Sequence, residues 1–372
     1  SLPDLIANRY LCRKKSIVVT GTHGKTTTTA MLTHILQEDN RDPGWMIGGI
    51  PVDLPVPCEL SSGEEFVIEG DEYDAVYWDK RPKFLLYKPS HAIINSIEFD
   101  HADIYDNLDA IELQFRRFVK LLPENGIIVA NGDSPLVRSI CEDAFCGILT
   151  IGTNDGYDWK INFNAFKEEN KAQISCPDYG IFELDSGLPG KHNLMNGLAA
   201  TAMSVALGVK IENALKALKK FRGVARRFEI VRQDSFISVY DDFAHHPTAI
   251  KTTLETIVSR HPNQKIWALL EPRSNSMVRS FFSQELIDGL KLADVIVIGK
   301  VHRADAIPSE QRLDRNMLSD ELTKLGKQVC VADQIDEIEA YLRANLSGSD
   351  AIVMMSNGSF DRLRDRLISL GL

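Results

Sequence analysis

Residues 16–36 place the strongest constraint on what this chain can fold into. They read SIVVTGTHGKTTTTAMLTHIL, a short β-branched apolar run followed by apolar residues at helical spacing. The loop between the predicted strand and helix consists of Gly21, Thr22, His23, Gly24, Lys25 and Thr26, and Thr27 continues the helix. Two glycines let such a loop turn sharply, and its backbone N–H groups and the helix N-terminus then face an anion.

Lys25 and Thr26 supply the side chains that a nucleoside triphosphate site needs. In P-loop sites the lysine reaches the β- and γ-phosphates, and the hydroxyl of the next residue binds Mg²⁺. The spacing departs from G-x-x-x-x-G-K-[ST], because Val19 stands where the first glycine is expected. The alternative is an ordinary strand–helix turn with a surface lysine. We favour the triphosphate site, because Gly-Lys-Thr-Thr falls at the junction of strand and helix.

Composition limits the partners. With 372 residues and 44% apolar content, the chain can bury the cores of two or three domains. A net charge of −10 argues against nucleic acid or an anionic membrane as partner. The six cysteines include no C-x-x-C pair, and no apolar run reaches membrane-spanning length. We therefore expect a cytoplasmic protein, a monomer, with reduced thiols and small-molecule substrates.

Polar groups follow two further predicted strands, at 66–69 and 91–95. Because ligands bind beyond the carboxyl ends of parallel strands, these groups are expected near Lys25. Glu69 with Thr26 forms a sensible pair for Mg²⁺. His101 is a candidate for a second metal, with a simple hydrogen-bonded histidine as the alternative. The rest of the acidic segment, Asp71, Glu72 and Asp74, is expected to be a solvated loop.

The remaining pattern predicts an α/β protein of two domains, residues 1–222 and 223–372. The first is expected to have a mainly parallel sheet, with helices at 108–122, 189–207 and 211–221, a strand at 126–130, and a small antiparallel ribbon at 159–165, 173–176 and 180–184. The second alternates strands (236–240, 265–270, 295–298, 328–331, 351–355) with helices (247–259, 283–291, 317–325, 336–345, 361–369), as a Rossmann-like domain does. No G-x-G-x-x-G follows its first strand, so dinucleotide binding is not supported.

Two more groups of side chains suit a bound nucleotide. Asn193 and Asn196 lie one helical turn apart, and an asparagine amide pairs with both N6 and N7 of adenine. Arg226 and Arg227 follow the predicted domain boundary and can stabilise developing negative charge on the phosphates. The alternative for the arginines is a basic linker.

Six motifs together resemble the Mur ligases, ATP-dependent enzymes that form amide bonds in peptidoglycan precursors. In chain order they are T-G-T-H-G-K-T-T-T, E-G-D-E-Y-D, N-S-I-E-F-D-H-A-D, G-K-H-N-L-M-N-G-L-A-A, G-V-A-R-R-F and D-D-F-A-H-H-P-T. Two further segments, L-E-P-R-S-N-S-M (270–277) and M-S-N-G-S-F (355–360), are similar to the recycling branch of the family. That branch joins UDP-N-acetylmuramate to the tripeptide L-alanyl-γ-D-glutamyl-meso-diaminopimelate.

The resemblance implies a role for each matching residue. Lys25 and Thr26 match the phosphate and magnesium residues, Glu69 the first-metal ligand, and His101 the histidine at the second metal. Asn193 and Asn196 match the adenine contacts, Arg227 the arginine near the γ-phosphate, and Asp242 the aspartate near the ribose. Arg273, Ser274 and Asn275 occupy the segment that faces the incoming amino acid or peptide, and His245 can approach it from the next strand end. The alternative for Arg273 is a salt bridge to Glu271.

The sequence departs from the family pattern at two points. Many relatives carry a carbamylated lysine after the second-metal histidine, whereas residues 102–119 contain no lysine. Relatives also begin with a domain that binds the UDP group, and this chain resembles only the central and C-terminal domains. Three alternatives remain: another ligase of this architecture, such as the L-alanine or folylpolyglutamate enzyme; a P-loop kinase or NTPase; and an inactive nucleotide-binding module.

Overall fold

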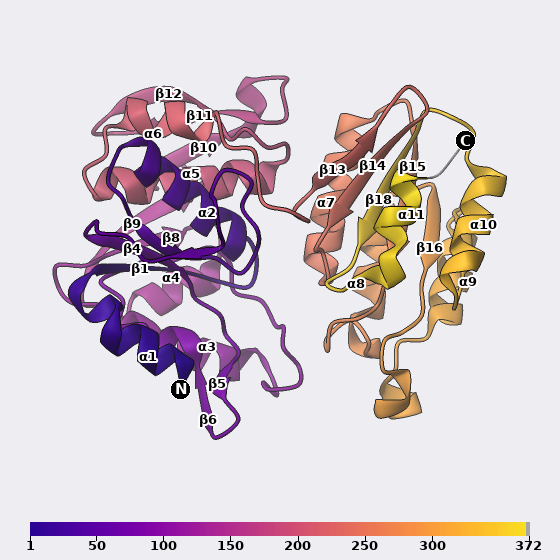
Figure 1. Ribbon diagram of the computed structural model, residues 1–372, viewed down its shortest axis with the longest axis horizontal. Coiled ribbons are helices and arrows are strands. Elements are labelled where there is room, and N and C mark those ends of the chain that lie inside the picture. Colours follow the sequence, from indigo (N-terminus) through magenta and orange to yellow (C-terminus); the bar gives the residue numbers. More distant parts are fainter. Residues whose placement is uncertain (370–372) are drawn as a thin grey trace. The chain divides into compact units, whose positions relative to one another are not determined.

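The computed structural model describes residues 1–369, which form two compact units that divide between Ala225 and Arg226 (Figure 1). The division lies three residues after the predicted boundary. Val224 pairs with Pro51 in an isolated antiparallel bridge, and the N–H of Ala225 donates to the carbonyl oxygen of Ile50 at 2.8 Å. These backbone contacts keep the segment attached to the first unit.

The first unit is built on a sheet with the order β12-β11-β10-β9-β8-β7-β1-β4-β2-β3. Its strands are β1 (Lys15–Thr20), β2 (Gly44–Met46), β3 (Cys58–Glu59), β4 (Glu65–Glu69), β7 (His91–Ile94), β8 (Ile127–Asn131), β9 (Gly147–Gly152), β10 (Trp159–Asn162), β11 (Lys171–Cys176) and β12 (Gly180–Asp185). Strand β1 lies between β4 and β7 and is parallel to both. Strands β10, β11 and β12 form the antiparallel ribbon. A separate hairpin pairs β5 (Asp74–Val76) with β6 (Asp79–Pro82).

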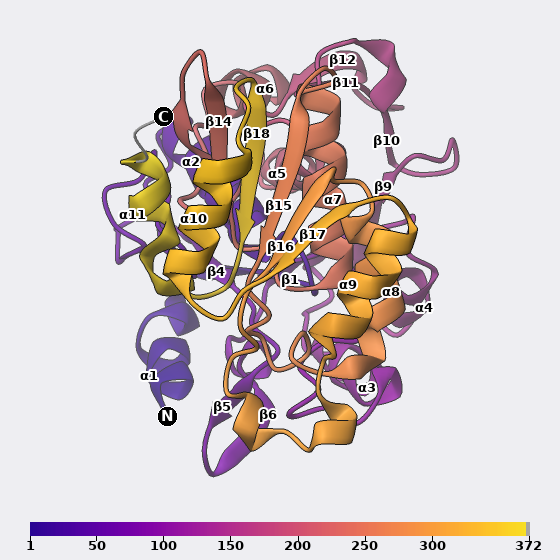
Figure 2. The same ribbon diagram turned by 90° about the vertical axis from the view of Figure 1, so that its right-hand side faces the viewer.

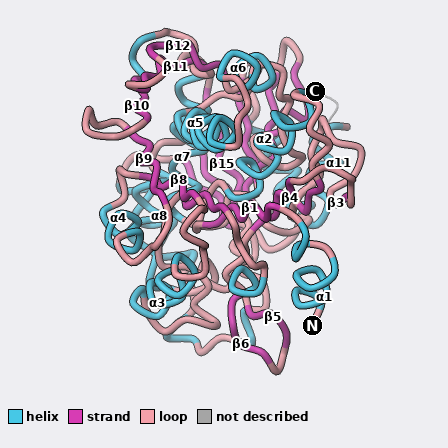
Figure 3. Tube along the Cα trace, turned by 90° about the vertical axis from the view of Figure 1, so that its left-hand side faces the viewer, coloured by secondary structure: helices cyan, strands magenta, loops and turns pink. Residues whose placement is uncertain are grey.

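Helices cover both faces of this sheet, because the strand side chains alternate between two cores. Ile17 and Val19 belong to one core and Val18 to the other. Helices α2 (Lys25–Glu38), α5 (Lys191–Ala206) and α6 (Ile211–Leu218) pack on the first core. Helices α3 (Leu108–Val119) and α4 (Pro135–Cys141) pack on the other, where α1 (Leu2–Arg9) also lies (Figure 3).

The predicted parallel sheet, ribbon and helices of the first unit are confirmed, with local differences. The alternating pattern predicts a strand through Ala165, but β10 ends at Asn162 and a 3₁₀ turn follows at Phe163–Ala165. The Asn162 side chain ends the strand by accepting the N–H of Asn164. The sequence pattern also missed the helices α1 and α4, the strand β9 and the short strands β2, β3, β5 and β6.

The second unit has a six-stranded sheet with the order β13-β14-β18-β15-β16-β17 (Figure 2). Its strands are β13 (Glu229–Gln233), β14 (Ile237–Asp242), β15 (Lys265–Leu270), β16 (Val295–Ile298), β17 (Gln328–Val331) and β18 (Asp350–Met355), of which only β13 is antiparallel. Its helices are α7 (Pro247–Arg260), α8 (Ser283–Leu290), α9 (Arg315–Lys324), α10 (Ile335–Asn345) and α11 (Leu363–Ile368). The Rossmann-like alternation is confirmed, and two apolar cores again lie on the two faces of the sheet.

Over residues 1–369, no helix is both long enough and apolar enough to cross a membrane. The cysteines are all free thiols, two of them exposed (Cys12 and Cys58).

Candidate nucleotide and metal site

The loop from β1 to α2 adopts a backbone that only glycine fits at two positions. Gly21 has φ 118°, and a Cβ there would lie 2.7 Å from the carbonyl oxygen of Ser96. Gly24 is the N-cap of α2 with φ 78°, and a Cβ there would lie 2.4 Å from Asn196 Oδ1. The two glycines therefore let the loop approach both the end of β7 and the start of α5.

The segment after β7 holds this loop in place. The N–H of Thr22 donates to the carbonyl oxygen of Ser96 at 2.5 Å, and the hydroxyl of Thr22 accepts the N–H of Glu98 at 2.8 Å. Asn95 Nδ2 donates to the carbonyl oxygen of His23 at 3.2 Å and to Thr28 Oγ1 at 3.1 Å. The loop conformation is thus fixed by neighbours more than seventy residues away in sequence, and Asn95 is a contributor that the sequence analysis missed.

Lys25 is buried and held by oxygen atoms. Its Nζ donates to the carbonyl oxygen of Gly21 at 2.7 Å and to Glu72 Oε2 at 2.7 Å, and its side chain is only 12% exposed. Burial opposes the charge of Lys25, but Glu72, Asp71 and Glu69 outweigh it and raise the pKa of the ammonium group above its ordinary value. The lysine is therefore charged at neutral pH and lies at the loop, as a phosphate site requires.

The predicted magnesium pair comes together. Thr26 Oγ1 donates to Glu69 Oε1 at 2.9 Å, and the other oxygen of Glu69 accepts the N–H of Gly48 at 2.7 Å. Thr26 comes from the first turn of α2 and Glu69 from the end of β4, the strand next to β1. The parallel pairing of β1 and β4 is what places these residues, 43 apart in sequence, side by side.

Glu72 corrects an expectation, because it is not part of a solvated loop. Its residue exposure is 2%; Oε2 contacts Lys25 and lies 3.8 Å from His101 Nε2, while Oε1 is buried without a hydrogen-bond partner within the described chain. The neighbouring acids are more open: Asp71 pairs with Lys83 at 2.8 Å, and Asp74 with Lys80 at 2.6 Å. Glu72 therefore belongs to the site, together with Lys25 and His101.

His101 sits against Glu72 and an aromatic ring. Its centroid lies 4.1 Å from that of Tyr73, and its backbone has φ 58°. Burial disfavours the charged imidazolium, but the Glu72 carboxylate, as acceptor for the ring N–H, and the charges of Asp100 and Glu72 raise the pKa of His101 above its ordinary value. Ligand atoms of Asp71, Glu72 and His101 all lie within 4.8 Å of one another. Because Mg²⁺ takes oxygen ligands and Glu72 Oε1 has no other partner, these residues fit a bound divalent cation.

Asn193 and Asn196 are both buried at the start of α5. Asn193 Nδ2 donates to the carbonyl oxygen of Pro189 at 2.8 Å, and Asn196 Oδ1 faces Gly24 in the phosphate loop. His192, beside them, was missed by the sequence analysis. Its ring Nδ1 is buried without a partner in the described chain, and burial lowers the pKa of His192 to about 4. The helix start thus places the amide of Asn196 beside the loop. Contact of Asn193 and Asn196 with adenine stays a prediction.

In the second unit, Asp242 lies at the carboxyl end of β14 and organises its own loop. Its carboxylate accepts the N–H groups of Phe228 at 2.6 Å and Ala244 at 2.8 Å. Burial raises the pKa of Asp242, opposed by Arg227 and these hydrogen bonds. The guanidinium of Arg227 lies 4.6 Å from the ring centroid of Phe243. Roles for Asp242 and Arg227 at ribose and phosphate stay predictions.

The predicted peptide-binding segment follows β15. Ser274 Oγ donates to the carbonyl oxygen of His245 at 2.9 Å, so the structure brings these two predicted residues together, while Asn275 is exposed. Arg273 Nη1 lies 3.2 Å from Glu271 Oε1, which is the salt bridge that the sequence analysis named as the alternative. The side chain of Arg273 keeps 30% exposure, so the pairing does not remove it from solvent.

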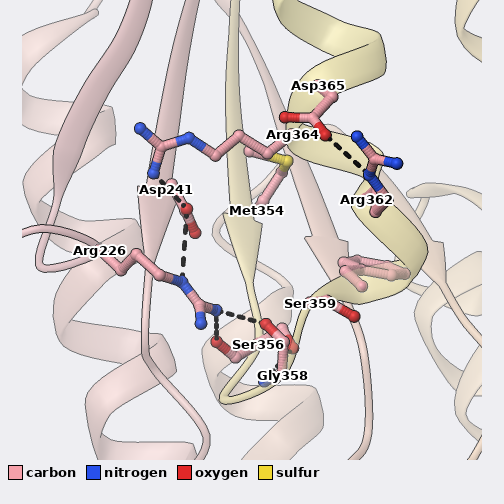
Figure 4. A pocket seen from close by; sticks show the side chains of 10 residues that line it. Arg226, Asp241, Met354, Ser356, Gly358, Ser359, Arg362, Arg364 and Asp365 are labelled. Atoms are coloured by element: carbon pink, nitrogen blue, oxygen red, sulfur yellow. Dashed lines mark hydrogen bonds and ion pairs between the residues drawn. The ribbon is translucent and has the colours of Figure 1, made fainter.

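A cavity of about 210 Å³ lies at the same edge of this sheet (Figure 4). Arg226 enters it, pairs with Asp241 at 3.4 Å and donates to the carbonyl oxygens of Ser356 and Gly358 at 2.6 Å. Arg364 pairs with Glu229 and Asp241. Carboxylates already neutralise these two arginines, so within the described chain the cavity is lined by ion pairs and does not offer a free cation to an anionic ligand.

Comparison with known proteins matches residues 19–204 to the Mur ligase middle domain and residues 226–358 to the Mur ligase, glutamate ligase domain. A UDP-N-acetylmuramate–L-alanine ligase of Clostridium botulinum is 31% identical over 99% of this chain and 78% of its own length. A UDP-N-acetylmuramate–L-alanyl-γ-D-glutamyl-meso-2,6-diaminoheptandioate ligase of Haemophilus influenzae is 32% identical over 98% of this chain and 78% of its own length. The crystal structure of a murein peptide ligase from Psychrobacter arcticus matches with a TM-score of 0.73 and 31% identity, over 99% of this chain and 79% of the other.

Proposed function

The chain belongs to the Mur ligase family of ATP-dependent, ADP-forming amide ligases of peptidoglycan synthesis, and from that premise we propose that it joins UDP-N-acetylmuramate to L-alanyl-γ-D-glutamyl-meso-diaminopimelate. The observation that carries the proposal is the joint placement of Lys25, Thr26 and Glu69 at the ends of adjacent parallel strands. Six free cysteines support the proposed cytoplasmic location, where thiols stay reduced.

The proposed reaction has two steps. A carboxylate oxygen of the muramate lactyl group attacks the γ-phosphorus of ATP, and the bond to the bridging oxygen breaks, giving an acyl phosphate and ADP. The alanine amine of the tripeptide then attacks the acyl carbon, loses a proton, and expels inorganic phosphate from a tetrahedral intermediate. Both steps bring anions together, so catalysis by this chain is mainly charge neutralisation and alignment.

Lys25 and the loop N–H groups suit the phosphate chain of ATP. The ammonium group of Lys25 is charged and buried, so its interaction with a phosphate is weakly screened. The first turn of α2 directs its free N–H groups at the same place. Arg227 is proposed to face the γ-phosphate, because its guanidinium lies over the ring of Phe243 and a planar guanidinium suits oxyanions.

Mg²⁺ is the metal that we propose for this site. Thr26 and Glu69 would hold one ion, and Glu72 and Asp71 with His101 would hold a second. Bound Mg²⁺ neutralises charge on phosphate oxygens and orients them. Residues 102–119 contain no lysine to carry a carbamate, and the buried carboxylate of Glu72 supports a protein ligand in its place.

The second candidate is an L-alanine ligase, because a relative of that name is as similar as the tripeptide enzyme. The segment Arg273-Ser274-Asn275 supports the tripeptide, since its cation and donors suit carboxylates that free alanine lacks. Phosphate release by the full-length protein with UDP-N-acetylmuramate tests the choice. Tripeptide-dependent release with no response to L-alanine is expected; release with L-alanine alone would replace the proposal with the second candidate.

A further inference from the structure

Two loops of the second unit meet at the carboxyl edge of its sheet. One follows β15 and the other follows β16, two strands that pair in parallel and lie side by side (Figure 2). The loops are joined by an isolated antiparallel bridge between Arg279 and Arg312, and the N–H of Leu313 donates to the carbonyl oxygen of Val278 at 2.9 Å. Two arginines, 33 positions apart in sequence, therefore face each other directly.

This arrangement puts two like charges together without an acid. Residues opposite each other in an antiparallel pair have Cβ atoms about 5 Å apart on the same side, and like charges there are destabilising. Arg279 Nη1 donates to Gln311 Oε1 at 2.8 Å, and Arg312 Nη2 donates to the carbonyl oxygen of Ile307 at 3.0 Å. Both acceptors are uncharged. In the part of the chain that the structure describes, neither arginine forms an ion pair, and the Nε of each is buried without an acceptor.

Three other arginines of this unit do form ion pairs: Arg273 pairs with Glu271, Arg315 with Asp333 and Arg364 with Glu229. Burial lowers the pKa of His302, on the same loop as Arg312; the positive charges of Arg273 and Arg303 lower it further, and Glu271 and Asp361 oppose them. Acids are thus present at this edge of the sheet, but within the described residues none of them forms an ion pair with Arg279 or Arg312.

We propose that Arg279 and Arg312 together bind a carboxylate of the acidic peptide substrate and so select the tripeptide over L-alanine. The inference rests on the proposed function and adds its specificity determinant. The γ-linked glutamate keeps its α-carboxylate, and diaminopimelate brings two more, so the tripeptide has carboxylates that alanine lacks. Guanidinium groups bind carboxylates with paired N–H donors, and the two guanidinium groups bond here only to uncharged acceptors within the described chain. The location fits, because ligands of parallel sheets bind beyond the carboxyl ends of strands.

The test uses Arg279→Gln, Arg312→Gln and the double variant in the full-length protein. We expect the apparent KM for the tripeptide to rise by about 10- to 100-fold in each single variant, as loss of a charged hydrogen bond would cause. Apparent KM values for ATP and UDP-N-acetylmuramate should stay unchanged. Arg312→Lys keeps the positive charge but lacks the planar guanidinium with its paired N–H donors, so its KM for the tripeptide should lie between those of wild type and Arg312→Gln. Arg260→Gln is the matched control and should leave the KM for the tripeptide unchanged. Arg260 is exposed and is the last residue of α7, which begins at the carboxyl edge of the sheet and ends at the opposite edge.

Thermal unfolding separates binding from a structural role. Removing one of two opposed like charges should leave the melting temperature unchanged or raise it, whereas a purely structural pair would lower it. If the wild-type enzyme ligates the tripeptide and both Gln variants keep its KM, the inference is overturned and the proposed function stands. If the enzyme ligates only L-alanine, the tripeptide assignment fails, and this inference fails with it, while the ligase chemistry remains established by phosphate release.

Discussion

Replacing Lys25 by methionine should destabilise the first unit even before any nucleotide is added. A lysine that only faces a ligand could be removed without harm to the fold. In the structure, however, the side chain of Lys25 is 12% exposed and that of its partner Glu72 is 3% exposed. The variant leaves Glu72 buried without its ammonium partner: Oε1 already lacks a hydrogen-bond partner within the described residues, and His101 Nε2 lies 3.8 Å from Oε2.

The magnitude follows from the cost of an unpaired buried charge. Removing one partner of a buried ion pair costs about 3–5 kcal/mol, and we expect about 3 kcal/mol for Lys25→Met because water still reaches the site. Glu72→Gln should cost less, about 1 kcal/mol, because Lys25 keeps its bond to the Gly21 carbonyl oxygen and the charges of Asp71 and Glu69 nearby. The double variant should cost about 2 kcal/mol rather than the sum, giving a coupling of about 2 kcal/mol.

Urea unfolding at pH 7.5, followed through the transition of the first unit, measures these values. Lys83→Met is the matched control, because its pair with Asp71 is about one-third exposed on both sides (32% and 31%) and should contribute at most about 1 kcal/mol.

A coupling below about 0.5 kcal/mol, with Lys25→Met as stable as wild type, would refute this reasoning, since interactions in one network normally couple by more than that. It would mean that the lysine and Glu72 are solvated in the free protein. Loss of phosphate release in Lys25→Met is expected in either case, so activity alone does not decide the point.

Three further predictions concern the same unit. Gly24→Ala should raise the KM for ATP at least about tenfold, because Gly24 has φ 78° and a Cβ there would lie 2.4 Å from Asn196 Oδ1. Gly156→Ala is the control and should leave steady-state kinetics unchanged, because no atom of the described chain lies within 4 Å of a Cβ there. Equal effects of the two substitutions would count against a role specific to the loop. Glu69→Ala should raise the Mg²⁺ concentration needed for half-maximal phosphate release, and an unaltered Mg²⁺ titration would remove Glu69 from the metal site. The pKa of His192 is lowered from 6.5 to about 4, so the unfolded state binds a proton that the folded state does not, and the free energy of unfolding should fall as the pH drops from 6.5 towards 4. In urea unfolding, His192→Gln should weaken this pH dependence. If the variant and the wild type lost stability equally over this pH range, the result would contradict the burial of the ring.

The sequence predicts those parts of the site that are local. Strand, glycine loop and helix at 16–36 are encoded within one stretch, and each residue type has a direct physical reason there. Glu69 is also predictable, because the end of a neighbouring parallel strand is a position that pairing alone determines. The alternation of strands and helices in the second unit is also predictable, because the spacing of apolar residues within each element indicates whether it is a strand or a helix.

What the sequence does not predict depends on distant packing. Glu72 reads as one of several acids in a polar segment, and its burial arises only when Lys25 reaches it and Tyr105 donates to its carbonyl oxygen at 2.8 Å. Arg279 and Arg312 lie in irregular loops without period, and only the pairing of β15 with β16 brings them together. Arg273 could be placed at a strand end, but not assigned to Glu271 or to a ligand.

The position of β1 between β4 and β7 also bears on when the site first exists during synthesis. The contacts of Thr26 with Glu69, of Lys25 with Glu72 and of Thr22 with Ser96 all bridge segments that leave the ribosome at different times. A nascent chain that ends before β7 has the glycine loop but lacks the contacts from Asn95, Ser96 and Glu98 that hold its backbone. Phosphate binding by the loop should therefore not begin before the segment through His101 has emerged, and the adenine contacts predicted for Asn193 and Asn196 need α5 as well. From that point ATP can act as a ligand that favours the paired strands over their open state.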